Sequence, residues 1–417
     1  MSKKVSVLTL VITLIIAVTI VFMLTFTLLS DYYRGRMAEI YEEDNSVSEN
    51  SGMSKYLDKI YVVDALFDKY SYFDLDEDAI VDGLLKGYAH GTGDKYAEYY
   101  NAEEYAEMRE SSNGEMQGIG INIIENAEYG VIEVINVMPD SPALEAGVKP
   151  GDLIVTVGTG DDAESVSELG YYPAVAKLQG KAGTVCEFTV ARGENYKEKV
   201  EFSIERGYVT ELSVLYHVYE PDKTIGIVKI VEFNGETPNQ FFAAIEELQK
   251  EGVTKFVFDV RYNPGGDLNA ICSVLDYILP EGPIIRTRDK AGNEETISSD
   301  ESEFTAPMVV LCNGNTASAA ELFTSALKDY KKATIVGEQT YGKGSMQSII
   351  PLGDGSGVKL TTKMYFPPFS EGYDGVGITP DIEIAQDEAL KGKNIYKITD
   401  EEDVQLGKAV SVLKEIN

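Results

Sequence analysis

A run of 26 uncharged and mostly apolar residues lies near the N-terminus, from Val5 to Ser30. About 20 residues at roughly 1.5 Å each cross a bilayer as a helix, so this run predicts a transmembrane anchor. Lys3 and Lys4 precede it, and the positive-inside tendency then places the N-terminus in the cytosol and the rest of the chain outside. The polar residues 31–52 that follow are typical of a linker.

Two further regions, with different patterns of apolar and polar residues, follow along the chain. Apolar residues recur at helical spacing over residues 53–112, for example at Leu57, Ile60 and Val63, and predict an N-terminal helical region. Residues 113–206 change to short apolar runs separated by turn residues, which indicates a small β-rich domain. We expect its strands at residues 119–124, 131–137, 153–157 and 186–191, with a short helix at 174–178.

Strands and helices alternate over residues 207–417, which predicts an α/β domain with a mostly parallel sheet. The strand at 253–260 is almost continuously apolar, as expected when both faces of a strand are buried. The other strands are expected at 225–231, 308–312 and 333–337, and the helices at 237–250, 268–279 and 317–330. Residues 346–368 return to strands, and a helix at 400–416 follows.

Composition excludes some functions. The 417 residues carry a formal charge of −33, whereas nucleic-acid binding requires a concentrated basic surface, so we expect no nucleic-acid partner. Three cysteines cannot form a disulfide framework. The two histidines, His90 and His217, leave little basis for a histidine-built metal site. We therefore expect neither a metal nor a cofactor.

Ser318 is the first candidate for chemistry. A buried strand and a polar turn precede it, and we expect it in the first turn of the next helix. The start of a helix favours negative charge, and a nucleophile at a strand-to-helix turn is a known arrangement for acyl transfer. Thr316 or Ser318 could equally serve only as the helix N-cap, so this motif alone leaves both interpretations open.

A serine nucleophile also requires a base. Neither histidine has a suggestive context, whereas Lys343 is flanked by two glycines that allow close packing around its amine. A lysine can act as a base if burial lowers its pKa from about 10.4. The same segment, Gly337–Lys343, matches the start of a phosphate-binding loop, G-x-x-x-x-G-K. Gly344 stands where that loop needs Ser or Thr, and a strand rather than a helix is expected next, which disfavours nucleotide binding.

Two glycine-rich turns complete the candidate sites. In Asp259–Gly266, a buried strand runs into Pro-Gly-Gly, and an N–H of Gly265 or Gly266 together with that of Ala319 would form an oxyanion hole. An ordinary strand-to-helix turn is the alternative, and which glycine would donate stays open.

The second glycine-rich turn lies in the β-rich domain and enters an apolar strand. Its backbone N–H groups can bind a peptide carboxylate while the strand edge pairs with the peptide. The residues are Gly118, Ile119, Gly120 and Ile121.

Together and in this order, residues 53–417 resemble the C-terminal processing peptidases, which are tail-specific serine proteases with a PDZ domain. Gln117–Ile123 with Ser141–Asp152 resembles the PDZ domain, and Asp259–Gly266 resembles the element D-L-R-x-N-P-G-G. G-V-G-I-T-P-D at residues 375–381 resembles the family's G-I-x-P-D.

The resemblance extends to the catalytic motifs. Ser318 matches the nucleophile of S-A-S-A-S-E, which reads T-A-S-A-A-E in this chain. Lys343 matches the base of T-x-G-K-G-x-x-Q, and Gln347 matches the residue that supports that lysine.

The resemblance implies a ClpP/crotonase-like α/β core and a membrane-anchored serine endopeptidase. Its PDZ domain would recognise the C-terminal tails of extracytoplasmic proteins, and Ser318 and Lys343 would cleave them without a cofactor. The expected partners are protein substrates and the membrane, and a homo-oligomer is left open. The alternative from another class is a membrane-anchored PDZ scaffold that binds tails without cleaving them.

Overall fold

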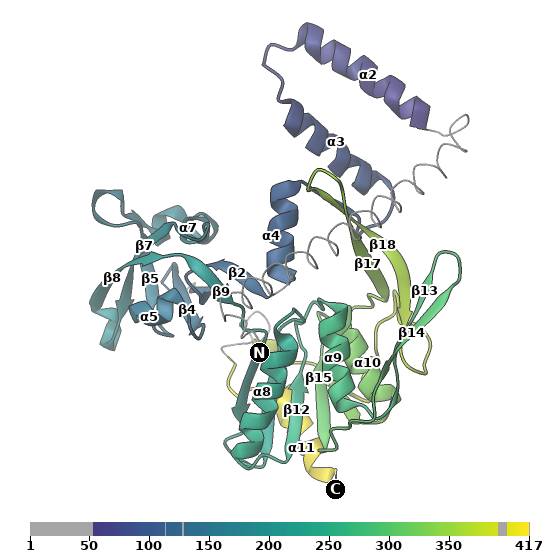
Figure 1. Ribbon diagram of the computed structural model, residues 1–417. Coiled ribbons are helices and arrows are strands. Elements are labelled where there is room, and N and C mark those ends of the chain that lie inside the picture. The colour runs from purple at the N-terminus through teal and green to yellow at the C-terminus, as the bar shows by residue number, and fades with distance from the viewer. Residues whose placement is uncertain (1–52, 113, 127–128, 391–397, 417) are drawn as a thin grey trace, which may run out of the picture. The chain divides into compact units, whose positions relative to one another are not determined.

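The computed structural model describes residues 53–416, apart from residues 113, 127–128 and 391–397 (Figure 1). Within this part of the chain, no helix is both long and apolar enough to cross a membrane. The predicted transmembrane segment Val5–Ser30 and the linker 31–52 lie outside the described residues.

The chain divides into two compact units, Met1–Val81 and Asp82–Asn417. In the first unit, the structure describes α2 (Met53–Tyr70) and the start of α3 (Glu77–Gly91), as the apolar spacing predicts.

The prediction of an all-helical region 53–112 is wrong at one place. A short strand, β1 (Glu98–Tyr100), separates α3 from α4 (Ala102–Ser112). It pairs with the distant strand β18, with Tyr99 opposite Val358. Long-range pairing of this kind overrides local helical spacing.

The β-rich part forms a six-stranded sheet with the path β3-β4-β5-β7-β8, in which the short β6 (Glu164–Ser165) pairs with β5. Its core is apolar and includes the fully buried Ile132, Ile154 and Phe188. β3 is an edge strand of this sheet. The elements are β3 (Ile121–Asn126), β4 (Val131–Val137), α5 (Pro142–Ala146), β5 (Leu153–Val157), α6 (Val166–Leu169), α7 (Tyr171–Leu178), β7 (Val185–Arg192) and β8 (Glu198–Glu205).

The four predicted strands of this region are confirmed, and β8 adds a fifth that the sequence analysis did not place. A separate two-stranded ribbon joins β2 (Glu115–Gly118) to β9 (Gly207–Thr210) in antiparallel pairing. The predicted helix at residues 174–178 is the second half of α7.

The α/β part is built on a six-stranded sheet in the order β10-β11-β12-β15-β16-β19. β10 is antiparallel to β11, and every other pair is parallel, so the predicted mostly parallel sheet is confirmed. Its strands are β10 (Val214–Val218), β11 (Ile225–Ile230), β12 (Lys255–Asp259), β15 (Met308–Cys312), β16 (Ala333–Gly337) and β19 (Ile382–Glu383).

Helices cover both faces of this sheet (Figure 1). Phe256 and Phe258 of β12 pack in one apolar cluster with α8, α9 and α10, whereas Val257 packs in a second cluster with α11. Burial on both faces explains the continuous apolar run that predicted β12. The helices are α8 (Thr237–Lys250), α9 (Leu268–Ile278), α10 (Ala319–Asp329) and α11 (Val404–Glu415).

A second sheet contains β1 and the four later strands β13 (Gly282–Asp289), β14 (Glu294–Ser299), β17 (Ser345–Pro351) and β18 (Gly357–Phe366). The β13–β14 hairpin was not predicted, because β14 is exposed and polar along most of its length. β17 begins two residues after Lys343, so a strand stands where a phosphate-binding loop would have a helix.

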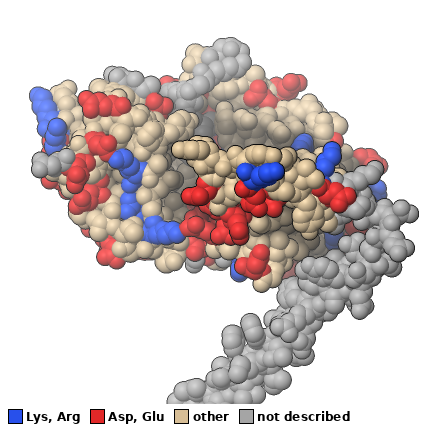
Figure 2. Space-filling view, turned by 90° about the horizontal axis from the view of Figure 1, so that it is seen from above, with Lys and Arg blue, Asp and Glu red and all other residues tan. Residues whose placement is uncertain are grey.

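Charged side chains are spread over the surface, and a small cluster of them is buried in the α/β part. Acidic side chains with basic ones between them spread over the face shown in Figure 2. In the interior, the guanidinium of Arg261, 3% exposed, donates to Asp259 Oδ2 and to Asp403 Oδ2, each at 2.7 Å. This cluster joins the end of β12 to the start of α11. Burial alone would raise the pKa of Asp259, but the charges of Arg261 and Lys229 lower it overall.

Candidate active site

Three turns that follow adjacent parallel strands carry the predicted site. Gly265 and Gly266 follow β12, Ser318 follows β15, and Lys343 follows β16. Because the carboxyl ends of parallel strands meet at one edge of a sheet, these turns lie together. The sheet order therefore explains how residues far apart in the sequence reach one site.

Ser318 stands just before α10, at the N-cap position rather than in the first turn as predicted. Its backbone has φ 56° and ψ −120°, a sparsely populated conformation that costs about 1–3 kcal/mol and persists only where the surroundings enforce it. The hydroxyl Oγ is 2.8 Å from the hydroxyl of Tyr365. Among the described residues, the Glu321 N–H donates to the Ser318 carbonyl at 2.9 Å rather than to this hydroxyl, so the simple N-cap interpretation does not account for the hydroxyl.

The Pro-Gly-Gly turn packs directly against this serine. A Cβ atom at Gly265, where φ is 107°, would lie 2.6 Å from Ser318 Cβ and 2.9 Å from the Ala319 nitrogen. The buried side chain of Asn263 holds the turn, because its Oδ1 accepts from the Gly265 N–H at 2.8 Å. Only glycine fits this close approach.

Two backbone N–H groups in this part of the site have no hydrogen-bond acceptor among the described residues. The Gly265 N–H is already used by Asn263, whereas in the described part of the chain the amides of Gly266 and Ala319 donate to no protein acceptor. Gly266 and Ala319 line one pocket with the nucleophile candidate, and an oxyanion hole requires two such N–H groups beside the nucleophile. The geometry thus favours Gly266 over Gly265 as the donor.

Lys343 lies between Gly342 and Gly344, and both glycines pack against the segment 374–377. A Cβ atom at either position would come within 2.9 Å of that segment. Burial lowers the pKa of the half-buried Lys343 amine, and the charges of Lys359 and Lys95 lower it further, while Glu321 opposes them. The shift favours the neutral amine that a base requires.

The Lys343 amine does not contact the serine in this structure. Its Nζ lies 4.4 Å from the centroid of the Tyr96 ring, and no hydrogen bond joins it to Ser318 Oγ among the described residues. Gln347, expected to support the lysine, instead donates from Nε2 to Thr361 Oγ1 at 3.1 Å. Ser318, Lys343 and Gln347 nevertheless line one pocket.

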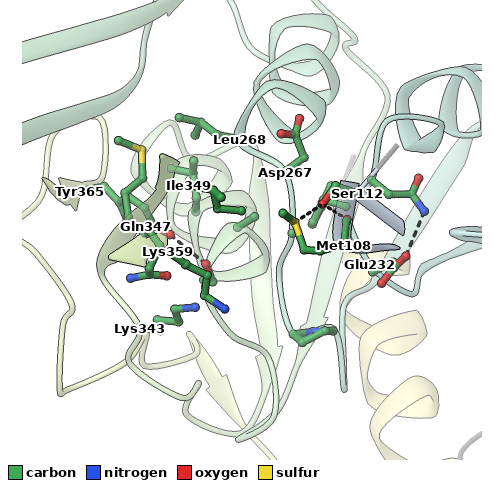
Figure 3. A pocket seen from close by; sticks show the side chains of 18 of the residues that line it. Met108, Ser112, Glu232, Asp267, Leu268, Lys343, Gln347, Ile349, Lys359 and Tyr365 are labelled. Atoms are coloured by element: carbon green, nitrogen blue, oxygen red, sulfur yellow. Dashed lines mark hydrogen bonds between the residues drawn. The ribbon is translucent and has the colours of Figure 1, made fainter. Parts of the chain in front are cut away.

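That pocket has a volume of about 490 Å³. Figure 3 shows Lys343, Gln347 and Tyr365 on one side, and Met108 and Glu232 on the other. Part of its wall is apolar, formed by Met108, Phe233, Leu268, Leu322, Met346 and Ile349. Neither histidine belongs to its lining; His217 instead lies 2.9 Å from Asp400.

Glu321 is a site residue that the sequence analysis missed. Its side chain is fully buried, and Oε2 accepts from the backbone N–H groups of Ser318 at 2.9 Å and Lys343 at 2.7 Å. Oε1 accepts from the Gly342 N–H at 2.6 Å and the Thr340 hydroxyl at 2.5 Å. One carboxylate therefore connects the nucleophile turn to the lysine loop. The spacing Ser318-x-x-Glu321, typical of a capping box, was the available signal.

The glycine-rich turn of the β-rich part has a comparable set of donors. The carbonyls of Ile119 and Gly120 accept from Ala143 and Met138, whereas their N–H groups donate to no protein acceptor in the described chain. A Cβ atom at Gly120, where φ is 81°, would lie 2.3 Å from Ser141 Cβ. The next strand, β3, begins at Ile121 and has an open edge. Open amides beside an open edge suit an extended peptide with a terminal carboxylate.

Comparisons with known proteins match a family to each of the two parts of the chain that hold these turns. The peptidase family S41 matches residues 224–384, and the PDZ domain family matches residues 108–187. The carboxy-terminal-processing protease of Bartonella bacilliformis is 34% identical over 329 residues, which are 77% of this chain and 73% of that protein. The carboxy-terminal processing protease CtpA of Bacillus subtilis is 31% identical, covering 80% of this chain and 70% of its own.

A solved structure described as an S41 protease of Bacteroides fragilis covers 84% of this chain and 93% of its own, with a TM-score of 0.51 at 17% identity. At that identity the likeness shows the fold alone. The identity to the curated relatives shows more: this chain belongs to the carboxy-terminal processing proteases of peptidase family S41, and it carries a PDZ domain.

Proposed function

We propose that this chain is a membrane-anchored serine endopeptidase that captures C-terminal tails and cleaves peptide bonds with Ser318 and Lys343. The observation that carries the proposal is the convergence at Ser318. Ser318 has a strained backbone, and it lines one pocket together with Gly266 and Ala319, whose amides have no acceptor among the described residues, and with Lys343, whose pKa is lowered. We assign the core, residues 207–417, to the ClpP/crotonase-like class.

In the proposed mechanism, neutral Lys343 removes the proton from Ser318 Oγ, and the oxygen attacks the scissile carbonyl. The amine must first leave the Tyr96 ring, which a rotation of its flexible side chain permits. The N–H groups of Gly266 and Ala319 stabilise the oxyanion. Water then hydrolyses the acyl-enzyme, again assisted by Lys343, and Gln347 supports the lysine once it has moved.

The PDZ domain, residues 113–206, supplies the substrate tail. The Ile119 and Gly120 amides bind the terminal carboxylate, and the peptide pairs with the open edge of β3 from Ile121 onward. Gly118 ends β2 and allows the chain to enter the turn. The substrates are therefore proteins with an unstructured C-terminal tail, because a tail must be extended to add a strand.

Substitution of the two catalytic candidates tests the proposal. In the full-length chain, Ser318→Ala and Lys343→Ala should each lower cleavage of an unstructured protein tail by about 10⁴-fold or more. Tail binding, measured by fluorescence anisotropy, should remain. His217→Ala is the matched control, since this histidine lies outside the pocket. Cleavage at the wild-type rate by Ser318→Ala would contradict the assignment and favour the non-catalytic PDZ scaffold or another nucleophile.

The anchor is the second part of the proposal. Val5–Ser30 holds the chain in the cell membrane, with the N-terminus in the cytosol and residues 31–417 outside. Lys3, Lys4 and the N-terminal amine precede the segment, and Asp31, Arg34 and Arg36 follow it, so the charge bias toward this orientation is small. Protease added to spheroplasts should digest the catalytic part, and its complete protection would reverse the orientation.

A further inference from the structure

One hydroxyl in the pocket has no role in the proposed mechanism so far. Tyr365 lies on β18, with its backbone N–H donating to the Gly344 carbonyl at 2.9 Å. Its side chain is 7% exposed, and its hydroxyl lies 2.8 Å from Ser318 Oγ. Among the described residues, Ser318 is the hydrogen-bond partner of this phenol. A buried phenol therefore touches the atom that performs the attack.

The chemistry of the two hydroxyls decides which one donates. Burial raises the pKa of Tyr365 to about 12, so the phenol keeps its proton across the pH range in which proteins work. During attack, the Ser318 proton must go to Lys343, so it cannot also be donated to Tyr365. Tyr365 is then the donor, and Ser318 Oγ accepts.

We propose that Tyr365 is a further catalytic residue, which donates a hydrogen bond to Ser318 Oγ while that oxygen carries negative charge. The inference rests on the proposed function of Ser318. A donor aimed at developing charge strengthens as the charge grows, because the hydrogen bond becomes charge-assisted. Its target is the attacking oxygen, whereas the Gly266 and Ala319 amides face the carbonyl oxygen.

The proton balance is simple. In acylation, the Ser318 O–H bond breaks and its proton goes to the lone pair of Lys343 Nζ. Oγ bonds to the carbonyl carbon, and the carbonyl π electrons move to its oxygen. The carbonyl then re-forms as the C–N bond breaks, and the leaving amine takes that proton from Lys343. In deacylation, water attacks the acyl carbon and gives a proton to Lys343, and Oγ then leaves the acyl carbon and takes that proton. The Tyr365 O–H bond stays intact in both steps, and the hydrogen bond stabilises Oγ as nucleophile and as leaving group.

The chain provides a matched control for this phenol. Tyr373 is also buried, at 3% exposed, and its ring centroid lies 6.4 Å from that of Tyr365. Among the described residues, its hydroxyl has no hydrogen-bond partner. Removal of either hydroxyl changes the packing by one oxygen atom, but only Tyr365 loses a contact with Ser318.

The experiment compares Tyr365→Phe with Tyr373→Phe in the full-length chain, using cleavage of one unstructured peptide. Tyr365→Phe should lower kcat by about 10²-fold, the usual effect of losing one such donor, with KM within about twofold. Tyr373→Phe should leave both parameters within about twofold. Ser318→Ala in the same assay separates the two hypotheses. If it still cleaves, the proposed function fails; if it is inactive while Tyr365→Phe keeps kcat within about threefold, only the role of Tyr365 is overturned.

A second variant covers the case in which Tyr365→Phe does not fold, as judged by thermal unfolding. A fluorotyrosine at position 365 keeps the ring and hydroxyl but loses its proton at lower pH. Because a phenolate cannot donate, kcat should then fall on the alkaline side at lower pH than in the wild type. An alkaline limb identical to that of the wild type would overturn the proposal.

Discussion

Two turns of this protein present backbone N–H groups that have no acceptor within the described part of the chain, and the two turns are supported very differently. At Ile119–Gly120, the nearest side-chain support is the Ser141 hydroxyl, which lies 3.4 Å from the Gly120 carbonyl. At Gly266 and Ala319, the buried side chains of Asn263 and Glu321 hold the surrounding backbone with bonds of 2.6–2.9 Å.

The difference follows from the two anions that we assign to these turns. The carboxylate of a protein tail carries its charge before it binds, so the PDZ turn can adjust around it. An oxyanion exists only during the reaction, so its donors must be in place beforehand. The comparison therefore predicts that small changes cost more at the catalytic turn than at the tail-binding turn.

Gly265→Ala should give the largest effect. The new Cβ would meet Ser318 Cβ at 2.6 Å at a backbone φ of 107°, so the turn must move away from the nucleophile. We expect kcat to fall by about 10³-fold, at the upper end for loss of one oxyanion donor, with tail affinity unchanged. The control is Gly314→Ala, whose nearest contact would be an ordinary 3.7 Å. Equal kinetics for the two variants would contradict the packing argument.

Glu321→Gln comes next. An amide group cannot accept the four hydrogen bonds that this carboxylate accepts, so at least one buried N–H loses its partner. The loss should lower stability by about 1–3 kcal/mol in denaturant unfolding. It should also lower kcat by about 10²-fold, because the Ser318 and Lys343 turns lose their shared support. The folded variant should bind the tail with wild-type affinity. A loss of tail affinity as large as the loss in kcat would contradict the independence of the two turns.

The pH dependence of cleavage and of tail binding should distinguish the two turns in the wild-type protein, without any substitution. The pKa of Lys343 is lowered from its ordinary value of 10.5, chiefly by burial. In the proposed mechanism, the neutral amine is the active form. Below that lowered pKa, kcat/KM should rise by about tenfold per pH unit, whereas tail binding should stay flat, because no lysine base takes part in it. A rate that falls steadily above pH 7 would argue for a different base.

Gly120→Ala should give the smallest effect. The Cβ would lie 2.3 Å from Ser141 Cβ, but the open edge of β3 can still pair with the peptide. We expect the tail Kd to rise by about tenfold, equivalent to about 1.4 kcal/mol, while cleavage of a short peptide without a recognised tail stays unchanged. Gly207→Ala, with an ordinary contact of 3.5 Å, is the control. A loss of short-peptide cleavage in Gly120→Ala would contradict the independence of the two turns.

Local patterns predicted most of the α/β fold, because strands buried on both faces, such as β12, must be continuously apolar. The same reasoning failed for β1, whose partner Val358 lies far along the chain, and for the exposed β14, which carries no apolar alternation. The sequence motifs also predicted Ser318, Lys343 and the two glycine turns.

The parts of the site that could not be predicted depend on tertiary contacts. The choice between Gly265 and Gly266 depends on the direction of the Asn263 side chain. Tyr365 reaches Ser318 only because β18 folds back beside the lysine loop, and nothing in its local sequence marks it among the 26 tyrosines of the chain.

The hydrogen-bond partners of Glu321 are synthesised at different times, because they lie on both sides of it in the sequence. Ser318 leaves the ribosome before the loop 340–343 and before Tyr365. Until those residues emerge, the Glu321 carboxylate lacks its hydrogen-bond donors in the loop 340–343, and Ser318 lacks the base that we propose for it. Under the proposed mechanism, a nascent chain that has not yet reached Lys343 therefore holds its nucleophile without a base and does not cleave peptide bonds.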